Sequence, residues 1–128
     1  MQKNSKENQK SVLVVEDETP IARALEIKMK RENLLVTCVA NGNDALSALR
    51  EQNFSVMLLD LMIPEPDGFS ILESLQNSDD LNRPNTIAVT SNLSQEEDRE
   101  RVASLGAEKY FIKSNTSLND LVAWVKDN

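Results

Sequence analysis

Residues 56 to 68, VMLLDLMIPEPDG, decide the fold of this chain: four apolar residues run into an acid and then into a loop with two prolines. Val56 to Leu59 show no polar alternation, which is typical of a strand covered on both faces. The prolines prevent a helix from continuing there, and the final Asp-Gly is a turn or cap signal. The segment predicts a buried strand that ends in a carboxylate, Asp60, which on its own could equally serve only as a cap for the next segment.

Apolar runs of this kind recur and alternate with segments of helical periodicity. We expect strands over residues 12–15, 34–40, 56–59, 86–90 and 109–113. The first helix should run from Thr19-Pro20 to about Glu32, because proline suits the first helical position. The helices are expected to turn these apolar residues inward: Ile21, Leu25 and Met29; Ala45, Leu46 and Leu49; Phe69, Leu72 and Leu75; and Leu118, Leu121, Val122 and Val125.

The helix expected over residues 94–105, SQEEDRERVASL, differs from the others because half of its residues are charged. Ser94 and Glu97 have the spacing of a capping box that opens the helix, and Gly106 suits its carboxyl-terminal cap. Val102, Ala103 and Leu105 are its apolar residues. This helix should therefore be weakly anchored to the core.

Strands that alternate with helices indicate a parallel sheet with right-handed crossovers and helices on both faces. The first, third and fourth strands have the most continuous apolar runs, so we expect them in the interior of the sheet. The sequence thus predicts a single doubly wound α/β domain, (βα)5, with the flavodoxin-like strand order 2-1-3-4-5. In such a sheet, ligands bind beyond the carboxyl ends of the strands, at the topological switch point between strands 1 and 3.

Length and composition limit the classes of function. The 128 residues suit one domain, which we expect over 11–128 after a disordered tail over 1–10. The net charge of -7 has the wrong sign for binding nucleic acid or an anionic membrane surface. No apolar run approaches the roughly 20 residues of a membrane helix. Cys38, the single cysteine, is expected to be a buried, reduced thiol, which favours a cytoplasmic location.

Polar residues lie at the ends of four of the expected strands and should meet at one edge of the sheet. Glu16 and Asp17 lie at the end of the first strand, Asp60 at the end of the third, Thr90 at the end of the fourth and Lys113 at the end of the fifth. Three carboxylates this close repel one another unless a cation lies among them, and oxygen ligands without cysteine or histidine favour Mg²⁺. The alternative for the acids that follow the first strand is a solvated turn.

Together these motifs resemble the response regulator receiver domain of two-component signal transduction, and the resemblance runs from Val12 to Val125. The matching features are the acidic pair after VLVV, the LLDLMIPEPDG segment, Thr90 before a small residue, and Lys113 after YFI. The resemblance implies that a sensor histidine kinase or a histidine phosphotransfer protein gives a phosphoryl group to Asp60. The chain has no histidine, so the donor must come from outside. Such a domain is not an enzyme beyond its own phosphorylation and dephosphorylation.

The resemblance also implies a role for each site residue. Asp17 and Asp60 bind Mg²⁺ directly, Glu16 acts through water, and Met62 contributes its backbone carbonyl. Lys113 pairs with one phosphoryl oxygen, and the Thr90 hydroxyl donates to another. Ser114 departs from the family, where proline usually follows the lysine through a cis bond. Either the Lys113-Ser114 bond is cis, which costs about 3 kcal/mol, or a different loop presents the lysine.

The output implied by the resemblance passes through Thr90 and Tyr110. Thr90 moves toward the phosphoryl group and Tyr110 turns inward. The face formed by the helix over 94–105, the strand over 109–113 and the last helix of the chain changes as a result. That face contacts a downstream protein target, an output domain or a second copy in a phosphorylation-dependent homodimer. The alternative for Tyr110 is packing on an edge strand. Trp124 is expected to serve in packing or an interface, without a chemical role.

Two other functions remain open from the sequence. One is a receiver-like interaction module that takes no phosphate. The other is a phosphatase of the haloacid dehalogenase type, which also forms an aspartyl phosphate. That family requires a second acid two residues after the nucleophile, where this chain has Met62.

Overall fold

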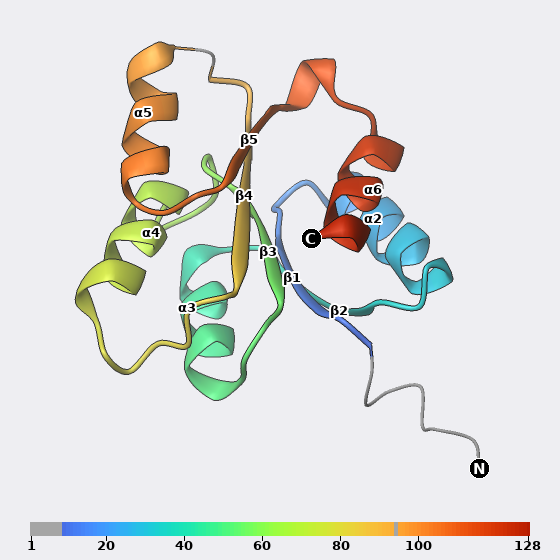
Figure 1. Ribbon diagram of the computed structural model, residues 1–128, viewed down its shortest axis with the longest axis horizontal. Coiled ribbons are helices and arrows are strands. Elements are labelled where there is room, and N and C mark those ends of the chain that lie inside the picture. The colour runs from blue at the N-terminus through green and yellow to red at the C-terminus, as the bar shows by residue number, and fades with distance from the viewer. Residues whose placement is uncertain (1–8, 94) are drawn as a thin grey trace.

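The computed structural model describes residues 9–93 and 95–128, which form a five-stranded parallel sheet with helices on both faces (Figure 1). The strands are β1 (Ser11–Val15), β2 (Leu35–Val39), β3 (Val56–Asp60), β4 (Thr86–Ser91) and β5 (Lys109–Ile112). Their order is β2-β1-β3-β4-β5, and every neighbouring pair is parallel. The predicted fold class and strand order are confirmed.

Helices cover the sheet in two groups. Figure 1 shows α3 (Gly42–Glu51), α4 (Gly68–Asn77) and α5 (Glu96–Ser104) on one face, with α2 (Thr19–Arg31) and α6 (Leu118–Asp127) on the other. A short 3-10 turn, η1 (Lys113–Asn115), joins β5 to α6. Because the strands are parallel, the carboxyl ends of all five lie at one edge of the sheet.

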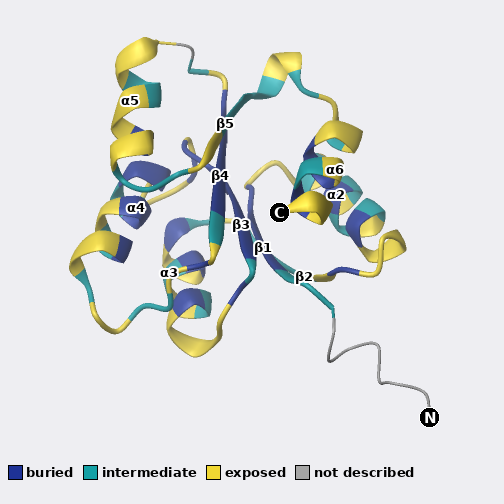
Figure 2. Ribbon diagram, viewed as in Figure 1, coloured by how far each residue is buried: buried dark blue, intermediate teal, exposed yellow. Residues whose placement is uncertain are grey.

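Each face of the sheet has its own apolar core, because successive strand residues point to opposite sides. In β1, Leu13 and Val15 belong to the core under α3, α4 and α5, whereas Val12 and Val14 belong to the core under α2 and α6. All five residues of β3 are buried, while β2 and β5 are partly exposed at the sheet edges (Figure 2). The continuous apolar runs do mark the interior strands, as predicted.

Local capping explains where most helices begin. The side chains of Asn41, Asp67 and Ser117 accept hydrogen bonds from backbone N–H groups at the start of α3, α4 and α6. At α5 the N-cap residue is Gln95, which makes no side-chain cap bond within the described part of the chain. Ser94, which we expected to cap this helix, lies outside the described residues. The start of α5 is thus the least secured of these four.

The expected inward residues do pack on the two cores, with Ile21, Leu46 and Leu118 half-buried rather than buried. Cys38 was predicted to be buried, but it is half-buried, because β2 is an edge strand. Burial still raises the pKa of its thiol to about 11, so Cys38 is an uncharged thiol at neutral pH.

Gln9 and Lys10, which precede β1, contact the ends of two helices. Gln9 donates hydrogen bonds to Asn33 after α2, and Lys10 donates to the carbonyls of Val125 and Lys126 in α6. Residues 1–8 lie outside the described part, so the tail over 1–10 stays a prediction. Within residues 9–93 and 95–128, no helix has the length and apolar character needed to cross a membrane.

Candidate functional site

The carboxyl edge of the sheet brings the predicted acidic residues together. Asp60 is the last residue of β3 and is buried, with 3% of its surface exposed. Glu16 and Asp17 directly follow β1, which pairs with β3. Glu16, Asp17 and Asp60 each offer a carboxylate oxygen, and these three oxygens lie within 4.8 Å of one another. The sheet topology therefore produces the acidic cluster that the sequence predicted.

The donor set of this cluster fits a small, hard cation. Mg²⁺ binds oxygen at about 2.1 Å, so two oxygens on opposite sides of one ion lie about 4.2 Å apart. The three carboxylate oxygens lie within 4.8 Å of one another, which is close to this span, so one ion can lie among them. Asp17 is exposed, which leaves an entry path from solvent and room for the waters that Mg²⁺ retains.

Lys113 brings the only positive charge that the described contacts place against these acids. Its ammonium nitrogen lies 2.9 Å from Asp60 Oδ2, 3.0 Å from Glu16 Oε1 and 2.7 Å from Glu18 Oε2. The lysine side chain is 14% exposed, so these pairs are shielded from bulk water more than ordinary surface pairs. Lys113 does meet the acidic residues at one edge of the sheet, as predicted, and it forms ion pairs with them.

The loop that presents Lys113 differs from our first expectation. β5 ends at Ile112, and Lys113 begins the turn η1 instead of ending the strand. Among the described residues the cis peptide bond joins Glu65 and Pro66, so Lys113-Ser114 is trans. Of the two alternatives for this departure, the different loop is the one observed. The Ser114 N–H donates to Asn92 Oδ1 at 3.1 Å, which ties the turn to the loop after β4.

Burial and pairing shift two pKa values in the site in the same direction. Desolvation raises the pKa of Glu16, although hydrogen bonds from the Glu18 N–H and from Lys113 oppose the rise. Burial alone would lower the pKa of Lys113, but its bonds to Glu18, Asp60 and Glu16 outweigh that and raise it. A raised acid pKa means that the ionised Glu16 costs folding stability above that pKa. A cation in the cluster would relieve this cost.

Two hydrogen bonds fix the orientation of the Asp60 carboxylate. Oδ1 accepts from the Met62 N–H at 3.0 Å, and Oδ2 accepts from Lys113 at 2.9 Å. The Met62 side chain itself is 62% exposed and lies beside the opening. An open depression above the carboxylate is lined by Asp17, Glu18, Asp60, Met62, Asn92, Leu93 and Lys113. A group that approaches from solvent can therefore reach Asp60.

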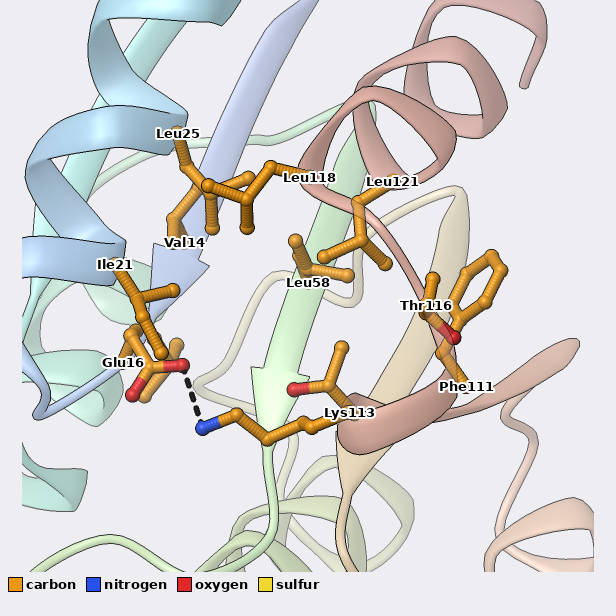
Figure 3. Close-up of a pocket in the computed structure, with 12 residues that line it drawn as sticks. Val14, Glu16, Ile21, Leu25, Leu58, Phe111, Lys113, Thr116, Leu118 and Leu121 are labelled. Carbon is orange, nitrogen blue, oxygen red and sulfur yellow. Dashed lines mark ion pairs between the residues drawn. The ribbon is translucent and has the colours of Figure 1, made fainter.

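A separate small cavity of about 60 Å³ lies behind the site, between the sheet and helices α2 and α6 (Figure 3). Apolar side chains such as Val14, Leu58 and Leu121 form most of its wall, and the Glu16–Lys113 ion pair closes one end. This apolar wall keeps water from the inner side of the pair, which accounts for the desolvation of Glu16.

Thr90 and Tyr110 connect the site to α5. Thr90 is buried in β4 opposite Asp60 in the strand register. Tyr110 is half-buried on β5, packs against the core under α5, and donates its hydroxyl to the Leu93 carbonyl at 2.6 Å. The Arg99 guanidinium of α5 lies 5.1 Å from the Tyr110 ring centre. Tyr110 is therefore tied to the loop that leads from Thr90 into α5.

Glu18 is the site residue that the sequence reasoning missed. The sequence has three consecutive acids at residues 16–18, but no pattern along it shows which of them faces the last strand. That choice depends on η1, which brings Lys113 to within 2.7 Å of Glu18. Trp124, by contrast, packs as expected, with its ring edge-on to Phe111 at 5.9 Å between centres.

Known proteins share this sequence pattern and fold. Residues 12–126 match the family described as response regulator receiver domain. The receiver domain of a Francisella response regulator, 1452, is 25% identical, with 93% of this chain and 95% of that chain covered and a TM-score of 0.83. The receiver domain of a histidine kinase from Syntrophus aciditrophicus is also 25% identical, with 92% and 88% covered and a TM-score of 0.78.

A third similar structure is a response regulator from Burkholderia pseudomallei that contains a phosphorylated aspartic acid, a calcium ion and citrate. It is 22% identical, with a TM-score of 0.78, and the match covers 90% of this chain and 65% of that chain. At this identity the likeness shows the fold.

Proposed function

This chain belongs to the response regulator receiver domain family, and we propose that it is a phospho-accepting signalling switch whose acceptor is Asp60. The observation that carries the proposal is the position of the Asp60 carboxylate. It belongs to the acidic cluster, lies 2.9 Å from the Lys113 ammonium and faces an open depression. The phosphorylated aspartate in the similar Burkholderia protein supports the same chemistry here.

The proposed donor is a phosphohistidine on a sensor histidine kinase or a histidine phosphotransfer protein. The chain contains no histidine, so it cannot supply this group itself. In the transfer, a carboxylate oxygen of Asp60 forms a bond to phosphorus while the bond from phosphorus to the donor nitrogen breaks. The imidazole of the donor leaves with the electron pair of that bond. A small acyl phosphate can replace the protein donor in the same way, with its carboxylate as the leaving group.

We assign the metal ligands from this chain's own oxygens. Asp17 and Asp60 would bind Mg²⁺ directly, the backbone carbonyl of Met62 would be a third ligand, and Glu16 would act through water. Bound Mg²⁺ supplies positive charge that offsets the carboxylates and the incoming phosphoryl group. Glu16 has a second task, because its carboxylate holds Lys113 at 3.0 Å and so positions the ammonium beside Asp60.

Lys113 and Thr90 are the proposed partners of the phosphoryl oxygens. Lys113 is charged at neutral pH, since its pKa is raised, and it needs to move little from Asp60 to reach a group bound there. Thr90 lies opposite Asp60 on the neighbouring strand and can turn its hydroxyl toward the same group. A hydrogen bond to a charged acceptor contributes about 1.5 to 3 kcal/mol.

The output would pass from Thr90 to the face formed by α5, β5 and α6. Tyr110 shares this face, and its bond to Leu93 ties it to the loop that Thr90 would pull. A downstream protein target, an output domain or a second copy of the chain would bind the altered face. The kinase binds before this change, while the chain is still unphosphorylated. Nucleic acid is not an expected partner because the net charge is -7.

Intact mass spectrometry after incubation with Mg²⁺ and acetyl phosphate tests the proposal. The wild-type protein should gain one phosphoryl group, and the gain should disappear without Mg²⁺ and in Asp60→Asn. A protein that gains nothing under any condition would instead be an interaction module with the receiver fold. A protein that consumes many equivalents of acetyl phosphate would instead act as a phosphatase.

A further inference from the structure

Glu18 has no part in the function proposed above, yet it makes the shortest of the three contacts to Lys113. The distances are 2.7 Å to Glu18, 2.9 Å to Asp60 and 3.0 Å to Glu16. A lysine ammonium carries three N–H donors; Glu18 and Asp60 accept two of them, and Glu16 lies at ion-pair distance. An arriving phosphoryl oxygen therefore competes with these carboxylates for the same ammonium.

The three partners differ in how easily they can be released. The Glu16 carboxylate is 4% exposed, so it would be left as an unpaired buried charge. Asp60 is equally buried, but it carries the phosphoryl group after transfer, so its negative charge passes to the phosphoryl oxygens. The Glu18 side chain is 57% exposed, so water can replace the lysine there at little cost. Of the two carboxylates that stay charged after transfer, Glu18 is therefore the partner that can leave.

The position of Glu18 at the start of α2 gives its side chain a second place to go. Glu18 is the N-cap residue of this helix, but its carboxylate makes no cap bond within the described part of the chain and reaches Lys113 instead. The first turn of a helix has unpaired N–H groups and a partial positive charge that favour a carboxylate. A released Glu18 can therefore turn back toward α2.

Resting on the proposed phosphoryl transfer, we propose that Glu18 is a positioning residue that occupies the phosphoryl-oxygen place at Lys113 and leaves when the phosphoryl group arrives. Before transfer, Glu18 holds the ammonium beside Asp60 together with Glu16. After transfer, the phosphoryl oxygen replaces Glu18 at the same N–H donor. Glu18 thus competes with the phosphoryl group and weakens its binding.

The test measures the affinity for beryllofluoride, a phosphoryl mimic, at saturating Mg²⁺ in the wild-type protein and three variants. Glu18→Gln removes the charge at constant size, and Glu18→Asp keeps the charge but withdraws it by one methylene. Glu65→Gln makes the same charge change on an exposed loop residue and serves as the matched control. All should fold, because Glu18 is exposed and makes no side-chain cap bond in the described structure.

We expect both Glu18 variants to bind beryllofluoride about two- to fivefold more tightly than Glu65→Gln, the range for an exposed ion pair. Equal or weaker binding would overturn the role of Glu18 and leave the proposed function standing. Failure of every protein, wild type included, to bind beryllofluoride would instead overturn the proposed function, and this inference with it.

The ¹⁵N signal of the Lys113 ammonium gives a second readout that a merely structural role would not change. The signal should differ between wild type and Glu18→Gln in the free proteins, because one hydrogen-bond partner differs. It should coincide in the two beryllofluoride complexes, since Glu18 has left in both. A difference that persists in the complexes would show that Glu18 stays bound and would overturn the inference.

Discussion

Helices α4 and α5 lie on the same face of the sheet, but they are attached to it in different ways (Figures 1 and 2). α4 buries five residues: Gly68, Phe69, Ile71, Leu72 and Leu75. Within the described chain α5 buries one, Val102. α4 also begins at a side-chain cap from Asp67, whereas Gln95 provides none for α5. Most of the apolar burial that holds helices to this face therefore belongs to α4 and its neighbour α3.

Polar contacts hold α5 in place of apolar burial. Arg101 pairs with Glu73 of α4 at 3.1 Å and lies 4.2 Å from the Phe69 ring centre, and Arg99 lies over Tyr110. Exposed ion pairs contribute at most about 1 kcal/mol, and exposed cation-π contacts about 0.5 to 1 kcal/mol. An event at Asp60 that provides a few kcal/mol can therefore displace α5 but not α4. The difference separates the scaffold from the element that can move.

The largest expected effect is on global stability. Leu72→Ala in α4 should lower the free energy of unfolding by about 2 to 5 kcal/mol, because Leu72 is fully buried. Val102→Ala in α5 should cost about 1 to 2 kcal/mol, from about 0.8 kcal/mol for each methyl group removed. Urea unfolding followed by circular dichroism measures both. A larger loss for Val102→Ala than for Leu72→Ala would reverse the comparison.

Amide hydrogen exchange should show the same contrast without any mutation. The amides in the middle of α5 should exchange roughly ten- to a hundredfold faster than those of α4, because α5 can open without global unfolding. Both helices are about the same length, so end fraying affects them alike. Equal protection in the two helices would mean that α5 is as firmly held as α4.

Magnesium should sharpen the contrast between the two helices. At tenfold excess over its Kd, Mg²⁺ should add about 1.4 kcal/mol to the free energy of global unfolding and so raise the melting temperature. Exchange from α4, which opens with the whole fold, should slow, while local opening of α5 should not change. Asp17→Asn is the control and should remove most of the stabilisation. A melting temperature that ignores millimolar Mg²⁺ in the wild type would contradict the metal assignment.

The smallest expected effect comes from the polar attachment of α5. Arg101→Gln loses both the Glu73 ion pair and the Phe69 contact, so α5 should open more easily by about 0.5 to 1 kcal/mol. Exchange from α4 should be unaffected. Arg50→Gln, which breaks the exposed pair between Arg50 of α3 and Asp80 in the loop after α4, is the matched control and should leave α5 unchanged. An effect of Arg101→Gln on both helices would show that they move together.

The sequence predicted the weak attachment of α5 because apolar periodicity reports directly on how much surface a helix buries. It also placed Glu16, Asp17, Asp60 and Lys113 at one edge, since parallel strands joined by crossovers end at the same side. Contacts between exposed polar side chains were not predictable in this way. Arg101 stacks on Phe69 across two helices, and no spacing along the chain encodes the angle between them.

Loop geometry limited the prediction at Lys113. The sequence left open how the lysine would be presented when Ser114 stands in place of proline. The trans bond and the turn η1 settle this, and the same turn brings Glu18 into the site. Cys38 was predicted to be more buried than it is, because an apolar run does not show that its strand lies at the sheet edge.

Amide NMR with beryllofluoride and Mg²⁺ tests most directly the central claim that a phosphoryl group at Asp60 moves α5 through Thr90 while α4 stays in place. In the wild type, we expect large shift changes around Asp17 and Asp60, in α5 and at Tyr110, with small changes in α4. Thr90→Ala should keep the changes at the site but lose most of those in α5, because the hydrogen bond that couples them is gone. Equal changes in α4 and α5, or wild-type changes at Tyr110 in Thr90→Ala, would contradict the account.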